Sequence, residues 1–133
     1  MESMSQALRR VTQSRAHPAP RFRYTPAIQV GAFAFVSGLV GLDPATGNLA
    51  QPSAAAETKQ VLENLRSLCE EQGWSINRLV FARVYCAGTD VAAKVNAAWD
   101  EFFHHDEPPA RSFVTVKALP LGAAVEIEFQ LLV

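Results

Sequence analysis

Two segments of the chain repeat apolar residues every three or four positions, which is the period of an amphipathic helix. In the first, predicted over 53–72, the apolar positions are Val61, Leu62, Leu65, Leu68 and Cys69. Ser53 is a favourable cap for this helix, and Gly73 is suited to end it in the left-handed conformation. The second helix is predicted over 91–104, with Asp90 as its cap.

The other apolar segments are short and rich in β-branched and aromatic residues, as strands are. They lie at 27–41, where two strands join near Gly31, and at 79–87, 111–118 and 123–132. The predicted order is therefore β-β-α-β-α-β-β, which is an α+β domain with a mostly antiparallel or mixed sheet. Because two helices cover only one face of such a sheet, the other face must be solvated or buried in an oligomer.

The last predicted strand alternates apolar and polar residues, so its two faces differ in character. One face carries Val125, Ile127 and Phe129, and the other carries Glu126, Glu128 and Gln130. The polar face is either simply solvated, or it presents a carboxylate to a cleft as a general acid or base.

Arg111 leaves a similar choice open. It follows Pro108 and Pro109, which restrict the backbone, and it precedes an apolar strand. It is either an ordinary surface charge or a rigid fork suited to a carboxylate or a phosphate. The spacing of residues alone favours neither interpretation.

The composition is that of one soluble globular domain, with 133 residues, 49% of them hydrophobic and 19% charged. The sequence has no membrane-length apolar run and no secretory signal, so we expect a cytoplasmic protein that does not enter a membrane. Residues 1–23 hold five arginines against one glutamate, a net charge of +4, whereas the other residues hold seven basic and twelve acidic side chains, a net charge of −5. We expect residues 1–20 to form a basic, flexible arm, which either touches an anionic partner or packs on the acidic body, and residues 21–133 to form a single domain.

Cysteines and histidines give no sign of a metal centre. Cys69 and Cys86 lack the spacing of a metal or redox pair, so we predict reduced core residues. His104 and His105 are adjacent and point in different directions on a helix, and we expect no metal site. Ser37 precedes a glycine, but "VSGLVG" is not the G-x-S-x-G elbow of a serine nucleophile, and no glycine-rich nucleotide loop is present.

Five segments, in the order "VSGLVGLDPATG", "QVLENL", "VNAAWDEFF", "PPARSFVTV" and "GAAVEIE", together resemble the Rid family. Its members are the reactive intermediate deaminases, also called YjgF-like proteins and labelled as L-PSP endoribonucleases. The resemblance implies a chorismate-mutase-like α+β fold and a homotrimer whose sheets form a central barrel, with active sites between subunits. It also implies hydrolysis of 2-imino or enamino acids of the 2-aminoacrylate type to 2-keto acids and ammonia, without any cofactor.

The resemblance also implies roles for individual residues. Arg111 of the "PARS" segment corresponds to the arginine that clamps the substrate carboxylate. Glu126 corresponds to the catalytic glutamate, which holds the attacking water and transfers a proton to the leaving nitrogen. Tyr24 and Ser37 correspond to residues that line the cleft, and Asn96 to a residue that supports it.

Two positions depart from the family pattern and make the expected cleft less polar. Phe113 stands where many members carry cysteine or another small residue, and Leu39 stands where glutamine is common. Phe113 either fills the space used by a longer substrate or lines it for an apolar one. A non-catalytic module that binds small carboxylates, and an activity on RNA motivated by the basic arm, are the alternatives. The acidic body makes nucleic acid the less favoured partner.

Overall fold

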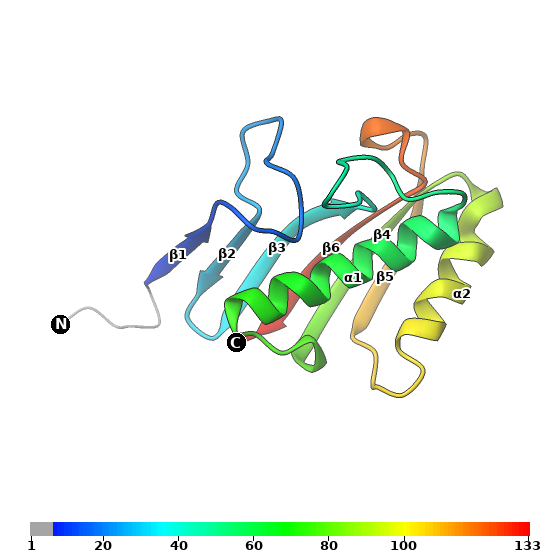
Figure 1. Ribbon diagram of the computed structural model, residues 1–133. Coiled ribbons are helices and arrows are strands. Elements are labelled where there is room, and N and C mark those ends of the chain that lie inside the picture. The colour runs from blue at the N-terminus through cyan, green and yellow to red at the C-terminus, as the bar shows by residue number, and fades with distance from the viewer. Residues whose placement is uncertain (1–6) are drawn as a thin grey trace.

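The alternating segments form one six-stranded mixed sheet in the computed structural model, which describes residues 7–133 (Figure 1). The strands are β1 (Leu8–Val11), β2 (Ala27–Val30), β3 (Phe33–Val40), β4 (Leu79–Ala87), β5 (Ala110–Val116) and β6 (Val125–Leu132). Their order across the sheet is β1-β2-β3-β6-β4-β5. Only β4 and β5 run parallel, and the other neighbouring pairs are antiparallel. The α+β prediction is confirmed.

The first helix, α1 (Ala54–Gln72), has the ends that its sequence predicts. The Ser53 hydroxyl accepts a hydrogen bond from the backbone N–H of Ala56. Gly73 adopts φ 76°, and its N–H closes the last turn on carbonyls of that turn. The predicted apolar positions of α1 are buried against the sheet. The predicted start and end of α1 are confirmed, because each depends on the chemistry of a single residue next to the helix in the sequence.

The second helix, α2 (Ala92–Phe102), begins differently from the prediction. A 3₁₀ turn, Thr89–Val91, precedes it, and Asp90 lies inside that turn and makes no capping hydrogen bond. The proposed Asp90 cap is therefore wrong. Two further 3₁₀ turns are Ile76–Arg78, before β4, and Pro120–Gly122, before β6.

The two helices lie on one face of the sheet (Figure 1), and the hydrophobic core lies between the helices and the sheet. The alternation predicted for β6 is confirmed, because Val125, Ile127 and Phe129 are at most 2% exposed in this core. In the single chain, nothing among the described residues covers the other face. Phe33 and Phe35, on that face of β3, are 44% and 41% exposed. An oligomer interface or solvent must meet this surface.

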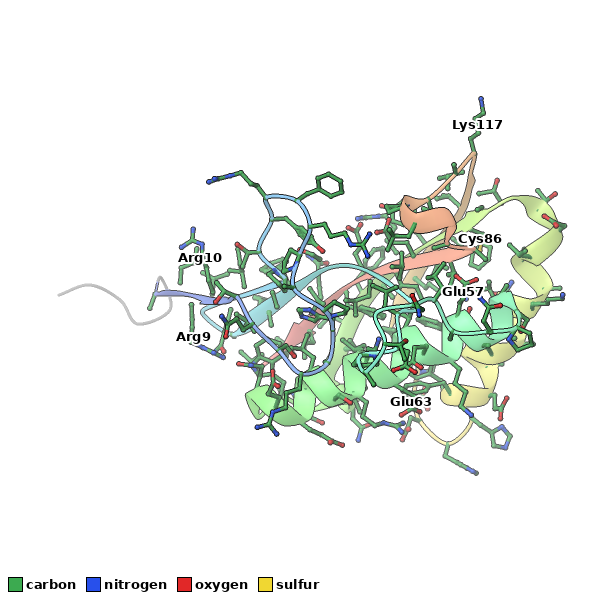
Figure 2. The ribbon with its side chains drawn as sticks, turned by 45° about the horizontal axis from the view of Figure 1, so that its top comes forward. Arg9, Arg10, Glu57, Glu63, Cys86 and Lys117 are labelled. Carbon is green, nitrogen blue, oxygen red and sulfur yellow. The ribbon has the colours of Figure 1, made fainter. Side chains whose placement is uncertain are left out.

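Strand β1 lies in the segment that was expected to be a flexible arm, and the prediction missed it. It pairs antiparallel with β2. Figure 2 shows Arg9 and Arg10 projecting to opposite sides of this strand. The Arg9 guanidinium donates hydrogen bonds to the side-chain oxygens of Gln72 and Gln29, each at 2.8 Å. A four-residue strand with two arginines carries little local signal, because pairing with β2 creates it. Residues 1–6 of the expected arm lie outside the described residues.

Two smaller expectations can be compared directly with the structure. Cys69 and Cys86 are buried and unpaired, as predicted. Burial raises the pKa of the Cys69 thiol to about 11, so it stays protonated near neutral pH. Within residues 7–133, neither helix is long and apolar enough to cross a membrane.

Candidate functional site

Arg111 lies near the start of β5, on the face of the sheet that the helices cover. Its neighbour in register on β4 is Ala82, which is fully buried in the core. The guanidinium donates a hydrogen bond from Nη1 to Oδ1 of Asn96 on α2, at 2.9 Å. Its Cζ atom lies over two aromatic rings, 5.1 Å from the centroid of Trp99 and 4.9 Å from that of Phe113. Three predicted site residues thus meet here, together with one that was not predicted.

Trp99 is the functional candidate that sequence reasoning missed at this site. The sequence analysis gave it no functional role. Residues three apart on a helix lie on the same side, so its position after Asn96 was the available signal.

Glu126 lies on β6, on the uncovered face of the sheet, close to the backbone of Gly38. A Cβ atom on Gly38 would stand 2.8 Å from Oε2 of Glu126, so glycine provides the room that the carboxylate occupies. Burial, and then the charge of Glu128 two residues along the strand, raise the pKa of Glu126. A carboxyl with a raised pKa exchanges protons more readily near neutral pH than an ordinary one does.

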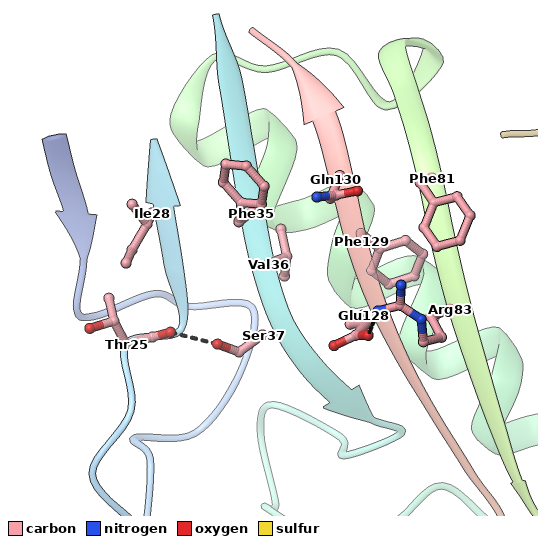
Figure 3. Close-up of a pocket in the computed structure, with 10 residues that line it drawn as sticks. All are labelled: Thr25, Ile28, Phe35, Val36, Ser37, Phe81, Arg83, Glu128, Phe129 and Gln130. Carbon is pink, nitrogen blue, oxygen red and sulfur yellow. Dashed lines mark hydrogen bonds and ion pairs between the residues drawn. The ribbon is translucent and has the colours of Figure 1, made fainter. Parts of the chain in front are cut away.

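Ser37 directly precedes Gly38, and Tyr24 directly precedes Thr25, the residue that Ser37 contacts. The Ser37 hydroxyl donates a hydrogen bond to the carbonyl of Thr25, at 2.6 Å (Figure 3). Its proton is therefore engaged, and its oxygen can accept a further hydrogen bond. The pairing of β3 with β6 shifts register between Val36 and Leu39, which includes the Ser-Gly motif. Tyr24 precedes Thr25 and is half exposed.

Beside Ser37, the uncovered face of the sheet is hollowed by a cavity of about 260 Å³ (Figure 3). An ion pair between Arg83 and Glu128 lies in it, and the Tyr85 hydroxyl donates to the same Glu128 oxygen at 3.0 Å. Phe81 forms an apolar wall, and the Arg83 guanidinium lies over its ring. The sequence analysis did not identify this network. The alternation of β4 contained the signal, because its core-facing residues predict that Arg83 and Tyr85 share the opposite face.

The structure does not bring Arg111 and Glu126 together within one chain. Arg111 is in register with Ala82, and Glu126 with Tyr85, and these β4 residues point to opposite faces of the sheet. Strand β4 also separates β5 from β6. Asn96, Arg111 and Phe113 therefore lie on one side of the sheet, and Ser37 and Glu126 on the other, whereas Tyr24 lies half exposed in the loop before β2. One small substrate cannot contact both groups in a single chain, because the sheet lies between them.

A metal ion would need several ligating side chains close together. Within residues 7–133, no three histidine, cysteine, aspartate or glutamate side chains are grouped closely enough to share a metal ion. The two groups instead offer a guanidinium, a carboxylate of raised pKa and two hydroxyls. Such groups suit anion binding and proton transfer.

A mixed six-stranded sheet with two helices on one face gives the chain an α+β architecture. The chain belongs to the Endoribonuclease L-PSP family, whose model matches residues 14–132. The resemblance to the Rid family is thereby confirmed.

Individual relatives agree with this assignment. A RutC family protein of Pyrococcus abyssi is 38% identical over 111 residues, covering 84% of this chain and 87% of that protein. The 2-iminobutanoate/2-iminopropanoate deaminase of Mus musculus is 36% identical over 125 residues, covering 94% of this chain and 92% of the mouse protein. A crystal structure of a Rid family member from Yersinia pestis superposes with a TM-score of 0.87 at 30% identity, covering 96% of this chain and all of that one.

Proposed function

We propose that this protein hydrolyses 2-imino or enamino acids to 2-keto acids and ammonia, and that Arg111 and Glu126 are its catalytic pair. The observation that carries the proposal is the state of the Arg111 guanidinium. The guanidinium lies over two aromatic rings and donates one hydrogen bond to Asn96. It therefore keeps donors for a carboxylate, in a chain whose mouse relative is named an imine deaminase.

The chemistry follows from the two groups. Arg111 binds the substrate carboxylate through two parallel hydrogen bonds, a geometry that lysine does not reproduce. Water adds to the carbon of the protonated imine while its proton passes to Glu126, and a neutral carbinolamine forms. The protonated Glu126 then returns that proton to the nitrogen, the C–N bond breaks with its electron pair leaving on ammonia, and the hydroxyl gives its proton to the Glu126 carboxylate to leave the keto group. Ser37 and Tyr24 orient the water and the substrate by hydrogen bonds.

The site we propose is shared between two copies of the chain, in a homotrimer. Two observations support the sharing. Arg111 and Glu126 lie on opposite sides of the sheet. The face that bears Glu126 also exposes Phe33 and Phe35, which suits burial against another subunit. Each boundary would then join the arginine of one copy to the glutamate of its neighbour.

A trapping assay tests the proposal. An amino-acid oxidase generates 2-iminobutyrate beside semicarbazide, and a deaminase lowers the yield of semicarbazone by hydrolysing the imine first. Arg111→Ala should reduce kcat/KM by about 100-fold or more, since hydrogen bonds to charged groups contribute about 1.5–3 kcal/mol each. Arg10→Ala removes an exposed arginine of β1 and serves as the matched control.

Three other results would point elsewhere. Equal rates for the wild type and Arg111→Ala across several imino acids would exclude the proposed role of the arginine. Calorimetric binding of a 2-keto acid without any deamination would favour a carboxylate-binding module. Cleavage of RNA by a nuclease-free preparation, lost on removal of residues 1–20, would favour the activity that the family's older label describes.

A further inference from the structure

The side chains around Arg111 form an arginine cradle, which we define as Asn96, Trp99 and Phe113. Asn96 accepts one hydrogen bond, and the two rings lie beneath the guanidinium at 5.1 Å and 4.9 Å. Trp99 is only 5% exposed and packs on Phe103, with ring centroids 4.6 Å apart. The indole is therefore fixed, and it offers the arginine a rigid surface.

Ring faces hold a guanidinium without using its donors. The attraction comes from the charge distribution of the ring, so the N–H groups stay free for hydrogen bonds in the guanidinium plane. Asn96 takes one of the five N–H donors. Within the described part of the chain, no carboxylate lies within ion-pair distance of Arg111. Its charge is thus oriented by the protein but not neutralised by it.

Arg83 shows the contrasting arrangement in the same molecule. Its guanidinium also lies over a ring, that of Phe81 at 5.2 Å, but it forms an ion pair with Glu128. An arginine that is already paired has little charge left to offer a ligand. The comparison identifies the unpaired, ring-bound Arg111 as the arginine prepared for an anion.

We propose that Trp99 and Phe113 are positioning residues, which hold the Arg111 guanidinium ready for the substrate carboxylate. The inference rests on the proposed function and goes beyond it by assigning a role to Trp99. It also assigns Phe113 the role of positioning the guanidinium, in addition to lining the cleft. An unrestrained arginine side chain loses rotamer freedom when it is immobilised, and the rings remove part of this entropic cost before the substrate arrives.

Removing either ring while keeping an apolar side chain tests the inference. Trp99→Leu and Phe113→Leu should each raise KM for 2-iminobutyrate about three- to tenfold. They should leave kcat nearly unchanged, because the carboxylate contact is the same in the ground state and the transition state. The dissociation constant for 2-oxobutyrate, measured by calorimetry, should rise by the same factor. Trp99→Phe and Phe113→Tyr keep a ring and should restore most of both values.

Phe102→Leu provides the matched control. Phe102 lies on the same helix and also carries a guanidinium over its ring, but that of Arg66, at 4.6 Å. Its replacement should leave KM and the 2-oxobutyrate affinity at their wild-type values. Because Trp99 is buried, Trp99→Leu could fail to fold, and Phe113→Leu, at a half-buried position, together with Trp99→Phe then carries the test.

The outcomes separate this inference from the proposed function. Wild-type KM and affinity in folded Phe113→Leu and Trp99→Leu would overturn the positioning role, as would a Trp99→Phe variant as weak as Trp99→Leu. If the wild type binds 2-oxobutyrate but hydrolyses no imine, the proposed function fails, and the affinities still decide the role of the rings. A wild type that binds no 2-keto acid would overturn both.

Discussion

Mixing two inactive variants tests whether Arg111 and Glu126 of different copies share one site. In a single chain they lie on opposite faces of the sheet, on β5 and β6. Arg111→Ala lacks the anion fork, and Glu126→Gln lacks the proton acceptor, so each variant alone should be inactive. A mixed assembly contains boundaries where an intact Arg111 from one variant meets an intact Glu126 from the other.

The size of the recovery follows from counting sites. In a random equal mixture, one half of the subunits carries an intact arginine and the other half an intact glutamate. If each site takes one residue from each of two neighbours, about a quarter of the sites are fully intact, so about a quarter of the wild-type activity should return. A site contained within one chain predicts no recovery, because no chain holds both residues.

The experiment needs proof that the subunits have exchanged. The two variants are unfolded together, refolded, and examined by native mass spectrometry, with a small tag giving one variant a distinct mass. The semicarbazone assay then measures deamination, and the two variants combined without unfolding serve as the inactive control. Confirmed mixed assemblies with no more activity than this control would refute the shared site and leave the two residues in separate roles.

Three further predictions concern the Glu126 carboxylate, the Gly38 backbone beside it, and the hydrophobic core. Gly38→Ala should lower kcat about 100-fold, since its Cβ would lie 2.8 Å from Oε2 of Glu126 and displace the carboxylate; calorimetry should show unchanged 2-oxobutyrate binding at Arg111. The fold raises the pKa of Glu126, so ionisation of this side chain costs stability as the pH rises through that pKa. Glu126→Gln should therefore raise the unfolding temperature at about pH 8. The gain should vanish toward about pH 4, where the wild-type glutamate is protonated and is as neutral as the glutamine that replaces it. Leu65→Ala, in the fully buried face of α1, should lower the free energy of unfolding in urea by about 2–5 kcal/mol, whereas Leu8→Ala, at 49% exposure, should cost far less.

The elements that the sequence predicted well are those whose signal is local. The ends of α1 depend on a capping hydroxyl and a left-handed glycine, and the faces of β6 depend on strict alternation. Strand β1 depends instead on the edge of β2, which lies about twenty residues further along the chain. Asp90 is a good cap by residue type, but the chain enters α2 through a 3₁₀ turn that no local pattern announced.

The candidate site shows the same division between local and non-local information. The resemblance selected Arg111 and Glu126, and alternation predicted that Glu126 points away from the core. The face of Arg111 could not be predicted, because it depends on the register of β5 against β4, which pairs Arg111 with a buried alanine. Trp99 was missed for a related reason, since a buried aromatic on a helix is ordinarily a core residue until a cation is found over its ring.

The uncovered face and the divided pair of residues are two aspects of one structural problem. A sheet with helices on one side must bury or solvate its other side, and here that side carries Glu126 together with exposed aromatic side chains. Solvent alone would satisfy the glutamate but not the phenylalanines, and it would leave the prepared guanidinium of Arg111 without a catalytic partner. A second copy against this face would remove both difficulties, because the contact that buries the aromatic residues could also supply the missing half of the site. Assembly and catalysis would then depend on the same surface, so substitutions such as Phe35→Asp should abolish both together.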